Sequence, residues 1–150
     1  MINRILVAYD GTDLSERVFE LALDLAVKYS AELTIINVIP RIEIPPSSII
    51  PFSPMQPAYV QGSEYQLCKS RTQLVLEVIK KTKKNYPNLN INAKLKIGDP
   101  SDIIVEVAEQ DEFDLIVMGS HGTHGIKRIF LGSTSDSVRI ESEVPVLLVK

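Results

Sequence analysis

Cysteine is almost absent from this chain of 150 residues, because Cys68 is the only one and no disulfide can form within the chain. That usage is typical of a reducing compartment, so we expect a cytoplasmic protein. No apolar run approaches the ~20 residues that a membrane-spanning helix needs. Met1 leads directly into strand-like sequence with no signal-peptide pattern. The sequence therefore predicts neither a disulfide scaffold nor a membrane protein.

An excess of positive charge is also lacking, since the formal net charge is -3. Nucleic-acid-binding domains are normally basic, so no nucleic-acid partner is expected. Lys80, Lys81, Lys83 and Lys84 are not interleaved with aromatic residues, and we expect them to be the solvated last turn of a helix. With 45% hydrophobic and 23% charged residues, the composition predicts a single globular domain over 1–150.

Apolar runs bounded by turn residues predict buried strands. These runs are Ile2–Tyr9, Leu33–Ile39, Ile91–Ile97, Asp114–Met118 and Val144–Val149. Helical patterns separate the runs, beginning with Asp13 and Glu16 at capping-box spacing. Further helices are expected from about Ser63 to Pro87, after Gly98-Asp99-Pro100, and over Thr134–Ser142. In the second of these, Asp99 is the N-cap candidate and Pro100 would occupy the first turn.

This alternation of strands and helices predicts an α/β fold: an open parallel five-stranded sheet with helices on both faces, of Rossmann-like architecture. Ligands bind such sheets beyond the carboxyl ends of the strands. The sequence therefore directs attention to Tyr9-Asp10-Gly11, to Val38-Ile39 and to the residues from Met118 onward. The segment 40–62 interrupts the pattern with prolines at 40, 45, 46, 51, 54 and 57. We expect it to be a flexible loop, acting as a lid, as a docking surface or simply disordered.

Glycines gather after the fourth expected strand. Gly119, Gly122 and Gly125 follow it, and Gly132-Ser133-Thr134-Ser135 opens the next helix. Main-chain N–H groups that no Cβ shields, hydroxyl groups and a helix N-terminus together form a generic cradle for an anion. The chain contains no G-x-x-x-x-G-K-[ST] run and no G-x-G-x-x-G after its first strand, so neither a Walker A loop nor a dinucleotide fold is predicted.

The spacing Gly119-x-x-Gly122, nine residues, then Gly132-Ser133 resembles the signature of the ATP-binding universal stress proteins. The resemblance extends along the chain through Asp10-Gly11-Thr12, the turn at Gly98, the run DLIVMGSHG and the final VPVLLV. It implies an adenine nucleotide alpha hydrolase-like fold with strand order 3-2-1-4-5. It also implies an ATP, ADP or AMP ligand, with Mg²⁺ arriving on the nucleotide phosphates.

The resemblance places individual residues around the nucleotide. Asp10, with Ala8 and Tyr9 before it, would lie beside the sugar and phosphates, and the main chain at Val38 would meet the adenine. Met118, Gly119, His121 and Gly122 would line the ribose and phosphates. Gly132, Ser133, Thr134 and Ser135 would hold the phosphates. Thr134 stands where the family often has an aliphatic residue, which preserves the size of the side chain.

Other roles are compatible with some of these residues. Asp10 could cap the first helix as well as contact a ligand. His121 and His124 have no third ligand of matching spacing, so no metal site is predicted. Lys127 and Arg128 could neutralise phosphate or be solvated loop cations.

Three functions remain open at this point: a nucleotide-dependent regulatory binder, a slow ATPase or nucleotidyl-transfer enzyme, and a dimeric scaffold with a vestigial pocket. The motif supplies donors but little that could activate water, which favours the binder. The final strand, Val144–Val149, is apolar and lies at a sheet edge, and the resemblance implies a homodimer through it.

Overall fold

The computed structural model describes residues 1–41, 56–120 and 133–150, without the side chains of 56–64 and 133. Its strands are β1 (Arg4–Ala8), β2 (Glu32–Ile39), β3 (Ile91–Ile97), β4 (Leu115–Gly119) and β5 (Val146–Val149). Its helices are α1 (Asp13–Tyr29), α2 (Gln56–Asn85), α3 (Pro100–Gln110) and α4 (Ser133–Glu141). Every strand and helix predicted from the sequence is present, although several begin or end at other residues.

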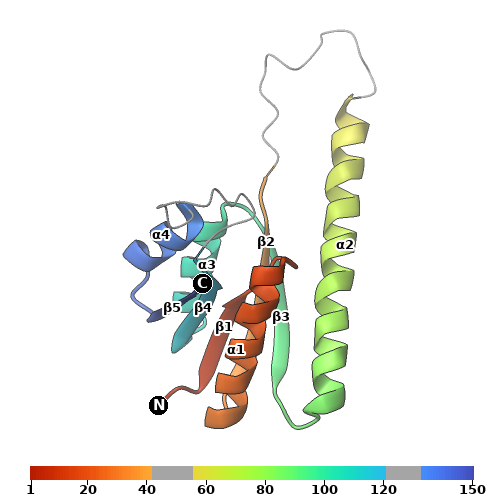
Figure 1. The fold of residues 1–150 in the computed structure, drawn as a ribbon. Coiled ribbons are helices and arrows are strands. Elements are labelled where there is room, and N and C mark those ends of the chain that lie inside the picture. Colours follow the sequence, from red (N-terminus) through yellow and green to blue (C-terminus); the bar gives the residue numbers. More distant parts are fainter. Residues whose placement is uncertain (42–55, 121–132) are drawn as a thin grey trace.

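Within the described residues the strands form a five-stranded sheet in the order β3-β2-β1-β4-β5, and all neighbouring strands are parallel. This confirms the predicted fold class and the strand order 3-2-1-4-5. The chain proceeds outward from β1 to β2 and β3, then returns to β4 on the other side of β1 (Figure 1). This reversal places the carboxyl ends of β1 and β4 where open α/β sheets bind ligands.

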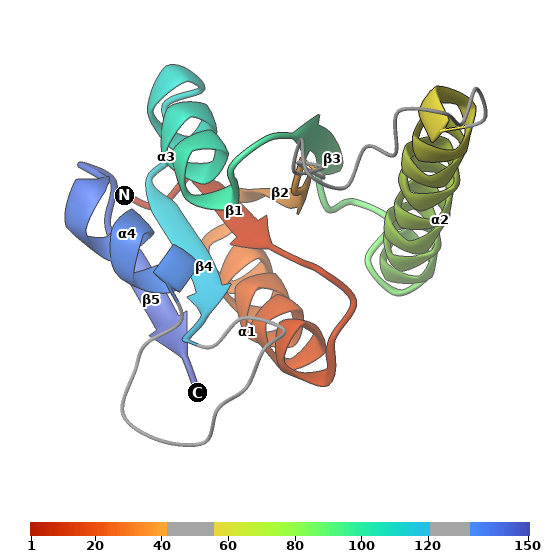
Figure 2. The same ribbon diagram turned by 90° about the horizontal axis from the view of Figure 1, so that it is seen from above.

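Helices cover both faces of the sheet and enclose two apolar cores (Figure 2). Ile5 points into the core beneath α1 and α2, where it joins Val18 and Val75. The next residue, Leu6, points into the core beneath α3 and α4 and joins Val138. Alternate side chains of a strand point to opposite faces, so a central strand buried on both sides must be apolar at every position.

The start of α1 differs from the predicted capping box. Thr12 is the N-cap, and its hydroxyl oxygen accepts a hydrogen bond from the Ser15 amide at 3.3 Å. Asp13 is already the first helical residue. The carboxylate of Glu16 does not return to the helix start, because it accepts a hydrogen bond from the Tyr9 hydroxyl. The prediction of a reciprocal cap between Asp13 and Glu16 is therefore wrong.

The cap of α3 confirms its prediction. Asp99 has extended backbone, and its Oδ1 accepts hydrogen bonds from the amides of Ser101 at 2.9 Å and Asp102 at 3.3 Å. Pro100 occupies the first turn, where a missing N–H costs the helix nothing. Gly98 and Asp99 thus turn the chain from β3 into α3.

The long helix α2 begins at Gln56, several residues before the expected start. Pro57 is compatible with helix there because the N–H groups of a first turn have no partner within the helix. The prediction of a loop over 40–62 is wrong for 56–62, whereas 42–55 lies outside the described residues. Figure 1 shows the first turns of α2 rising past the ends of the strands. Cys68 lies within α2.

The lysines near the end of α2 are solvated, as expected. Lys80, Lys81, Lys83 and Lys84 are all exposed, and the last two lie in the last turn of α2. Across the parts of the chain that the structure describes, no helix combines the length and apolar character that crossing a bilayer requires.

The strand β5 forms one edge of the sheet and pairs with β4, as predicted. It covers Val146–Val149, so Val144 and Pro145, which were expected within it, precede the strand. All four of its residues are half-buried. Because β5 is an edge strand, it has a neighbouring strand on one side only. Pairing of two copies through this edge stays a prediction.

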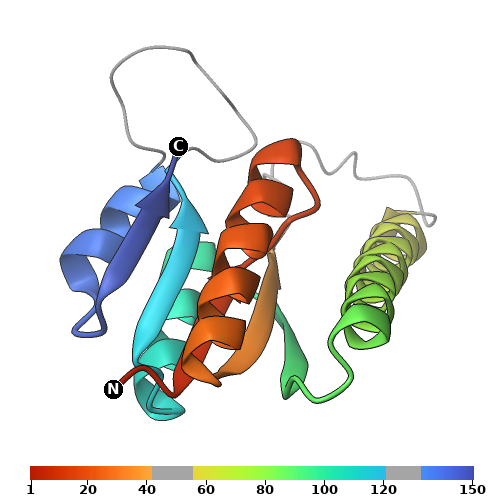
Figure 3. The same ribbon diagram turned by 60° about the horizontal axis from the view of Figure 1, so that its bottom comes forward.

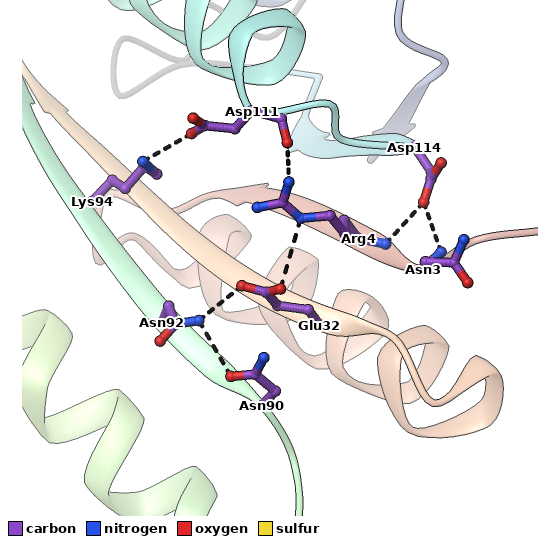
Figure 4. A network of polar contacts seen from close by, with 8 residues as sticks. All are labelled: Asn3, Arg4, Glu32, Asn90, Asn92, Lys94, Asp111 and Asp114. Carbon is purple, nitrogen blue, oxygen red and sulfur yellow. Dashed lines mark hydrogen bonds and ion pairs between the residues drawn. The ribbon is translucent and has the colours of Figure 1, made fainter.

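A polar network ties together the amino ends of the strands (Figure 4). Arg4 of β1 pairs with Glu32 of β2 at 3.7 Å, lies over the Phe113 ring at 4.9 Å and donates to the carbonyl of Asp111. Asp114 accepts hydrogen bonds from the amides of Asn3 at 2.7 Å and Arg4 at 2.9 Å, and these bonds lower its pKa. The network stabilises the end of the sheet opposite the expected ligand site.

Candidate nucleotide-binding site

A pocket of about 230 Å³ lies at the carboxyl ends of β1, β2 and β4. The first residues of α1 also line it. Figure 3 shows that α1 begins at the same edge of the sheet at which β4 and β5 end. The strands, α1 and α2 contribute Ala8, Tyr9, Asp10, Thr12, Leu14, Ser15, Ile36, Val38, Pro40, Arg71, Met118 and Gly119, and the first turns of α3 and α4 contribute Pro100, Ile104, Thr134 and Ser135.

The structure brings most of the predicted site residues into this pocket. Those that line it are Ala8, Tyr9, Asp10, Val38, Met118, Gly119, Thr134 and Ser135. Ser133 begins α4, but its side chain is not described. His121, Gly122 and Gly132 lie outside the described residues, as do His124, Lys127 and Arg128. Their roles stay predictions.

Asp10 follows β1 and is locked in place by Thr12. Its Oδ1 accepts two hydrogen bonds from that residue, from the amide at 3.0 Å and from the hydroxyl at 2.6 Å. Burial acts to raise the pKa of Asp10. The hydrogen bonds from Thr12 and Ser15 and the nearby Arg71 guanidinium outweigh it, so the pKa lies below its ordinary value. At neutral pH the pocket therefore contains a fixed carboxylate. The suggestion that Asp10 caps the first helix is wrong, because Thr12 is the N-cap and Asp10 instead holds Thr12.

Arg71 was not predicted as a site residue. It comes from α2, yet it lines the pocket, and its Nη1 donates a hydrogen bond to the main-chain carbonyl of Asp10. The two residues are 61 positions apart in the sequence, so no local pattern could associate them. Arg71 brings a positive charge to the pocket, and Asp10 is the carboxylate among the described residues that line it.

Tyr9 contributes to the pocket in a different way from Ala8. Its ring points into the core beneath α1, where it meets Phe19 edge-on with 6.0 Å between ring centroids. Its carbonyl accepts a hydrogen bond from Asn37 Nδ2 at 2.7 Å. Burial, followed by the hydrogen bond to Glu16, raises the pKa of the Tyr9 hydroxyl. That hydroxyl therefore stays protonated, on the face of the sheet away from Ala8.

One wall of the pocket is apolar. Val38 and Met118 form part of it, together with Ile36, Pro40 and Ile104. Ile104 also belongs to the core of the domain, since it is 4% exposed. Core residues at the carboxyl end of a sheet also become the floor of a ligand site.

The opposite end of the pocket is polar. Thr134 and Ser135 lie in the first turn of α4, where main-chain N–H groups have no partner within the helix. Ser135 is buried, and its hydroxyl contacts the carbonyl of Ser120 at 3.1 Å. This contact holds the start of α4 against the end of β4.

Metal ligands do not cluster in the described part of the chain. No group of three or more His, Cys, Asp and Glu side chains there could hold a metal ion. This result does not test the prediction that His121 and His124 form no metal site, because both residues lie outside the described part.

Comparison with known proteins covers the whole chain. The universal stress protein family profile matches residues 1–150. Universal stress protein MJ0531 of Methanocaldococcus jannaschii is 32% identical over 100% of this chain and 83% of its own. Universal stress protein YxiE of Bacillus subtilis is 30% identical over the full length of both chains.

Solved structures share the fold. The universal stress protein UspA from Lactobacillus plantarum has a TM-score of 0.77 at 22% identity, covering 99% of this chain and 97% of its own. A universal stress protein in complex with cAMP has a TM-score of 0.65 at 24% identity, covering 99% and 96%. The Archaeoglobus fulgidus protein in complex with dAMP has a TM-score of 0.64 at 22% identity, covering all of both chains.

The family profile spans all 150 residues, and the strand order is the one that the resemblance to this family implied. The chain belongs to the universal stress protein family.

Proposed function

We propose that this protein binds an adenine nucleotide, with ATP as the main ligand, and acts as a nucleotide-dependent regulator in stress responses. The observation that carries the proposal is the pocket itself. It combines an apolar wall, a fixed carboxylate at Asp10 and the N-terminus of α4 within one crevice. These are the features that a base, a sugar and a phosphate chain require, in that order.

The apolar wall suits the base. Val38 and Ile36 from β2 face Ile104 from α3 and form an apolar lining on which a planar ring can pack. The polar end suits phosphate, because the first turn of a helix presents main-chain N–H groups that have no partner within the helix, together with the positive end of the helix dipole. The predicted donors Gly132 and Ser133 adjoin this end in the sequence. Two related solved structures, described as complexes with cAMP and dAMP, support the choice of an adenine nucleotide.

Asp10 and Arg71 fit the sugar end of such a ligand. An ionised carboxylate accepts hydrogen bonds from ribose hydroxyls, whereas it repels phosphate. The guanidinium of Arg71 offsets that repulsion. Mg²⁺ would be held by phosphate oxygens and water, because this ion keeps several waters and needs few protein ligands.

A binder fits this pocket better than a hydrolase does. General-base catalysis works best when the pKa of the base lies near the operating pH. The pKa of Asp10 lies below its ordinary value, so its carboxylate is a weak base at neutral pH. Slow ATP hydrolysis or nucleotidyl transfer remains the alternative function. We also propose that the protein is a homodimer through β5 and that it is located in the cytoplasm.

Titration calorimetry tests the proposal directly. ATP, ADP and AMP would be titrated into the purified protein with and without MgCl₂, and we expect saturable binding to one site per chain. Thr134→Trp should abolish binding because the indole fills the phosphate end of the pocket. Ile140→Trp is the matched control, since Ile140 lies in the same helix with its side chain 70% exposed. Gly122→Val probes the predicted cradle outside the described residues.

The outcomes separate the three functions. Binding that Thr134→Trp removes and Ile140→Trp spares supports the nucleotide site. If neither ATP, ADP nor AMP binds the folded wild-type protein, the pocket is vestigial and the proposal is wrong. Turnover of ATP above roughly one per second, the low end of ordinary enzyme rates, would identify an enzyme instead.

A further inference from the structure

A second surface lies on the outer face of α2, and none of its residues lines the nucleotide pocket. The side chains that form it are Tyr65, Cys68, Lys69, Thr72, Gln73, Leu76, Glu77 and Lys80, which line a shallow hollow. The first four and Leu76 recur at spacings of three and four residues, which places them along one side of a helix. We refer to the whole set as the outer face of α2.

The outer face is distinct from the side that anchors α2 to the domain. Val75 is buried, and Leu74, Val78 and Ile79 pack against the core beneath α1 and α2. By contrast, Tyr65 is 65% exposed and Leu76 is 58% exposed. Figure 2 shows α2 at the margin of the molecule, next to the edge strand β3. Another protein can therefore approach the outer face without displacing any described element.

The charges on this face are complementary to themselves. Lys69 and Glu77 lie eight residues apart, too far along one helix to contact each other. When two copies of α2 run antiparallel about a two-fold axis at Gln73, Lys69 of each chain lies level with Glu77 of the other. Tyr65 then lies within one residue of Lys80 of the second copy, which allows a cation–π contact. At the centre of the contact the two Thr72 side chains lie next to each other, and one Leu76 lies on either side of them.

We propose that the outer face of α2 pairs with the same face of a second copy of this chain, antiparallel and centred on Gln73. A partner of one charge sign would leave either Lys69 or Glu77 opposed by a like charge, whereas a second copy satisfies both. The contact lies next to β3, at the edge of the sheet opposite to the edge that β5 forms. It is therefore separate from a β5 interface, and it uses no residue of the nucleotide pocket.

Disulfide trapping tests this pairing. In a Cys68→Ser background, Thr72→Cys places the two thiols about 3 Å apart along the helix axis at a rise of 1.5 Å per residue. Lys83→Cys in the same background is the matched control. It is also an exposed position on α2, yet the proposed register separates its two copies by about 30 Å. We expect mild oxidation of the full chain to produce covalent dimers of the first variant at least tenfold faster than of the second.

Charge exchange tests the register. In the Thr72→Cys background, Lys69→Glu and Glu77→Lys should each slow dimer trapping several-fold, because each creates facing like charges. The double exchange should restore the rate, and so should mixing the two single variants. Circular dichroism confirms that each variant keeps its helix.

Each contrary result overturns the proposal. Equal trapping at positions 72 and 83 would indicate random collision. Absence of trapping at 72 with rapid labelling by a small thiol reagent would show an uncovered face. Absence of both would show that another part of the chain covers it. Charge exchanges without effect would exclude the Lys69–Glu77 register.

Discussion

Arg71 donates a hydrogen bond to the carbonyl of Asp10, and this contact joins α2 to the end of β1. One residue later, Gly11 lies so close to α2 that an added Cβ would be 2.7 Å from Leu74 Cδ2. The turn that carries Asp10 is thus held from two sides, by Thr12 from within and by α2 from outside. The helix that contributes Arg71 to the proposed nucleotide site therefore also positions the carboxylate of that site.

Arg71→Met should weaken nucleotide binding about fivefold, which corresponds to roughly 1 kcal/mol, the net value of one hydrogen bond. The variant removes the contact that holds Asp10 and the charge that offsets its carboxylate. Calorimetry with ATP measures the change. Lys84→Met is the control, since it removes one exposed cation from the last turn of α2, outside the pocket. Equal losses in the two variants would show a general effect of net charge.

Asp10→Asn should change how stability depends on pH. The folded state lowers the pKa of Asp10, so ionisation of this group stabilises the fold above its unfolded pKa, about 3.9, and that stabilisation is lost as the pH falls through the folded value. We therefore expect wild type to exceed the variant in free energy of unfolding at pH 7, and the difference to shrink at pH 3. Urea titrations at both values measure it. A difference that is constant with pH would contradict the assignment.

Gly11→Ala should destabilise the fold by about 1–2 kcal/mol, because Gly11 has a φ of 83° and an L-residue is strained there. The added methyl group would also press on Leu74. In Leu74→Ala the same substitution should cost less, since only the backbone strain remains. Urea denaturation of the four proteins of this cycle measures the coupling. Strict additivity would argue against the close approach of α2 to this turn.

Asp99→Ala should cost about 1 kcal/mol by removing the cap of α3. Asp99→Asn keeps an oxygen that can accept from the Ser101 amide and should retain most of that stability. Thermal unfolding distinguishes the two. Because Pro100 and Ile104 line the pocket, nucleotide affinity should fall in the alanine variant as well. Equal melting temperatures for both variants and wild type would show that the cap is not needed.

Much of the fold could be predicted from the sequence because its signals are local. The cap at Asp99 and the apolar runs of β1 and β4 depend only on neighbouring residues, and the structure confirms them. The candidate site was predictable in part for the same reason, since Val38 and Met118 lie near the carboxyl ends of their strands and Asp10 lies just beyond one. Their meeting follows from parallel strands sharing one carboxyl edge.

Other features followed signals that several structures can satisfy. Asp13 and Glu16 have the spacing of a cap, but the hydroxyl of Tyr9 competes for the Glu16 carboxylate across the turn. Prolines through position 57 indicated a loop, yet a proline in a first helical turn costs nothing, so α2 begins at Gln56. In both cases the local pattern is compatible with more than one structure, so the pattern alone does not determine which one forms.

The sequence alone determined the order of the elements, the burial of the central strands and the glycine-serine motif that indicates the family, because these depend on residue type and spacing. Only the tertiary structure decided that Arg71 would reach Asp10 and that Ile104 would line the pocket. The same holds for Tyr65 and Leu76, which it left on an outer face. The physical reason is that packing brings together residues distant in the chain, and no periodicity within one segment records which other segment it will meet.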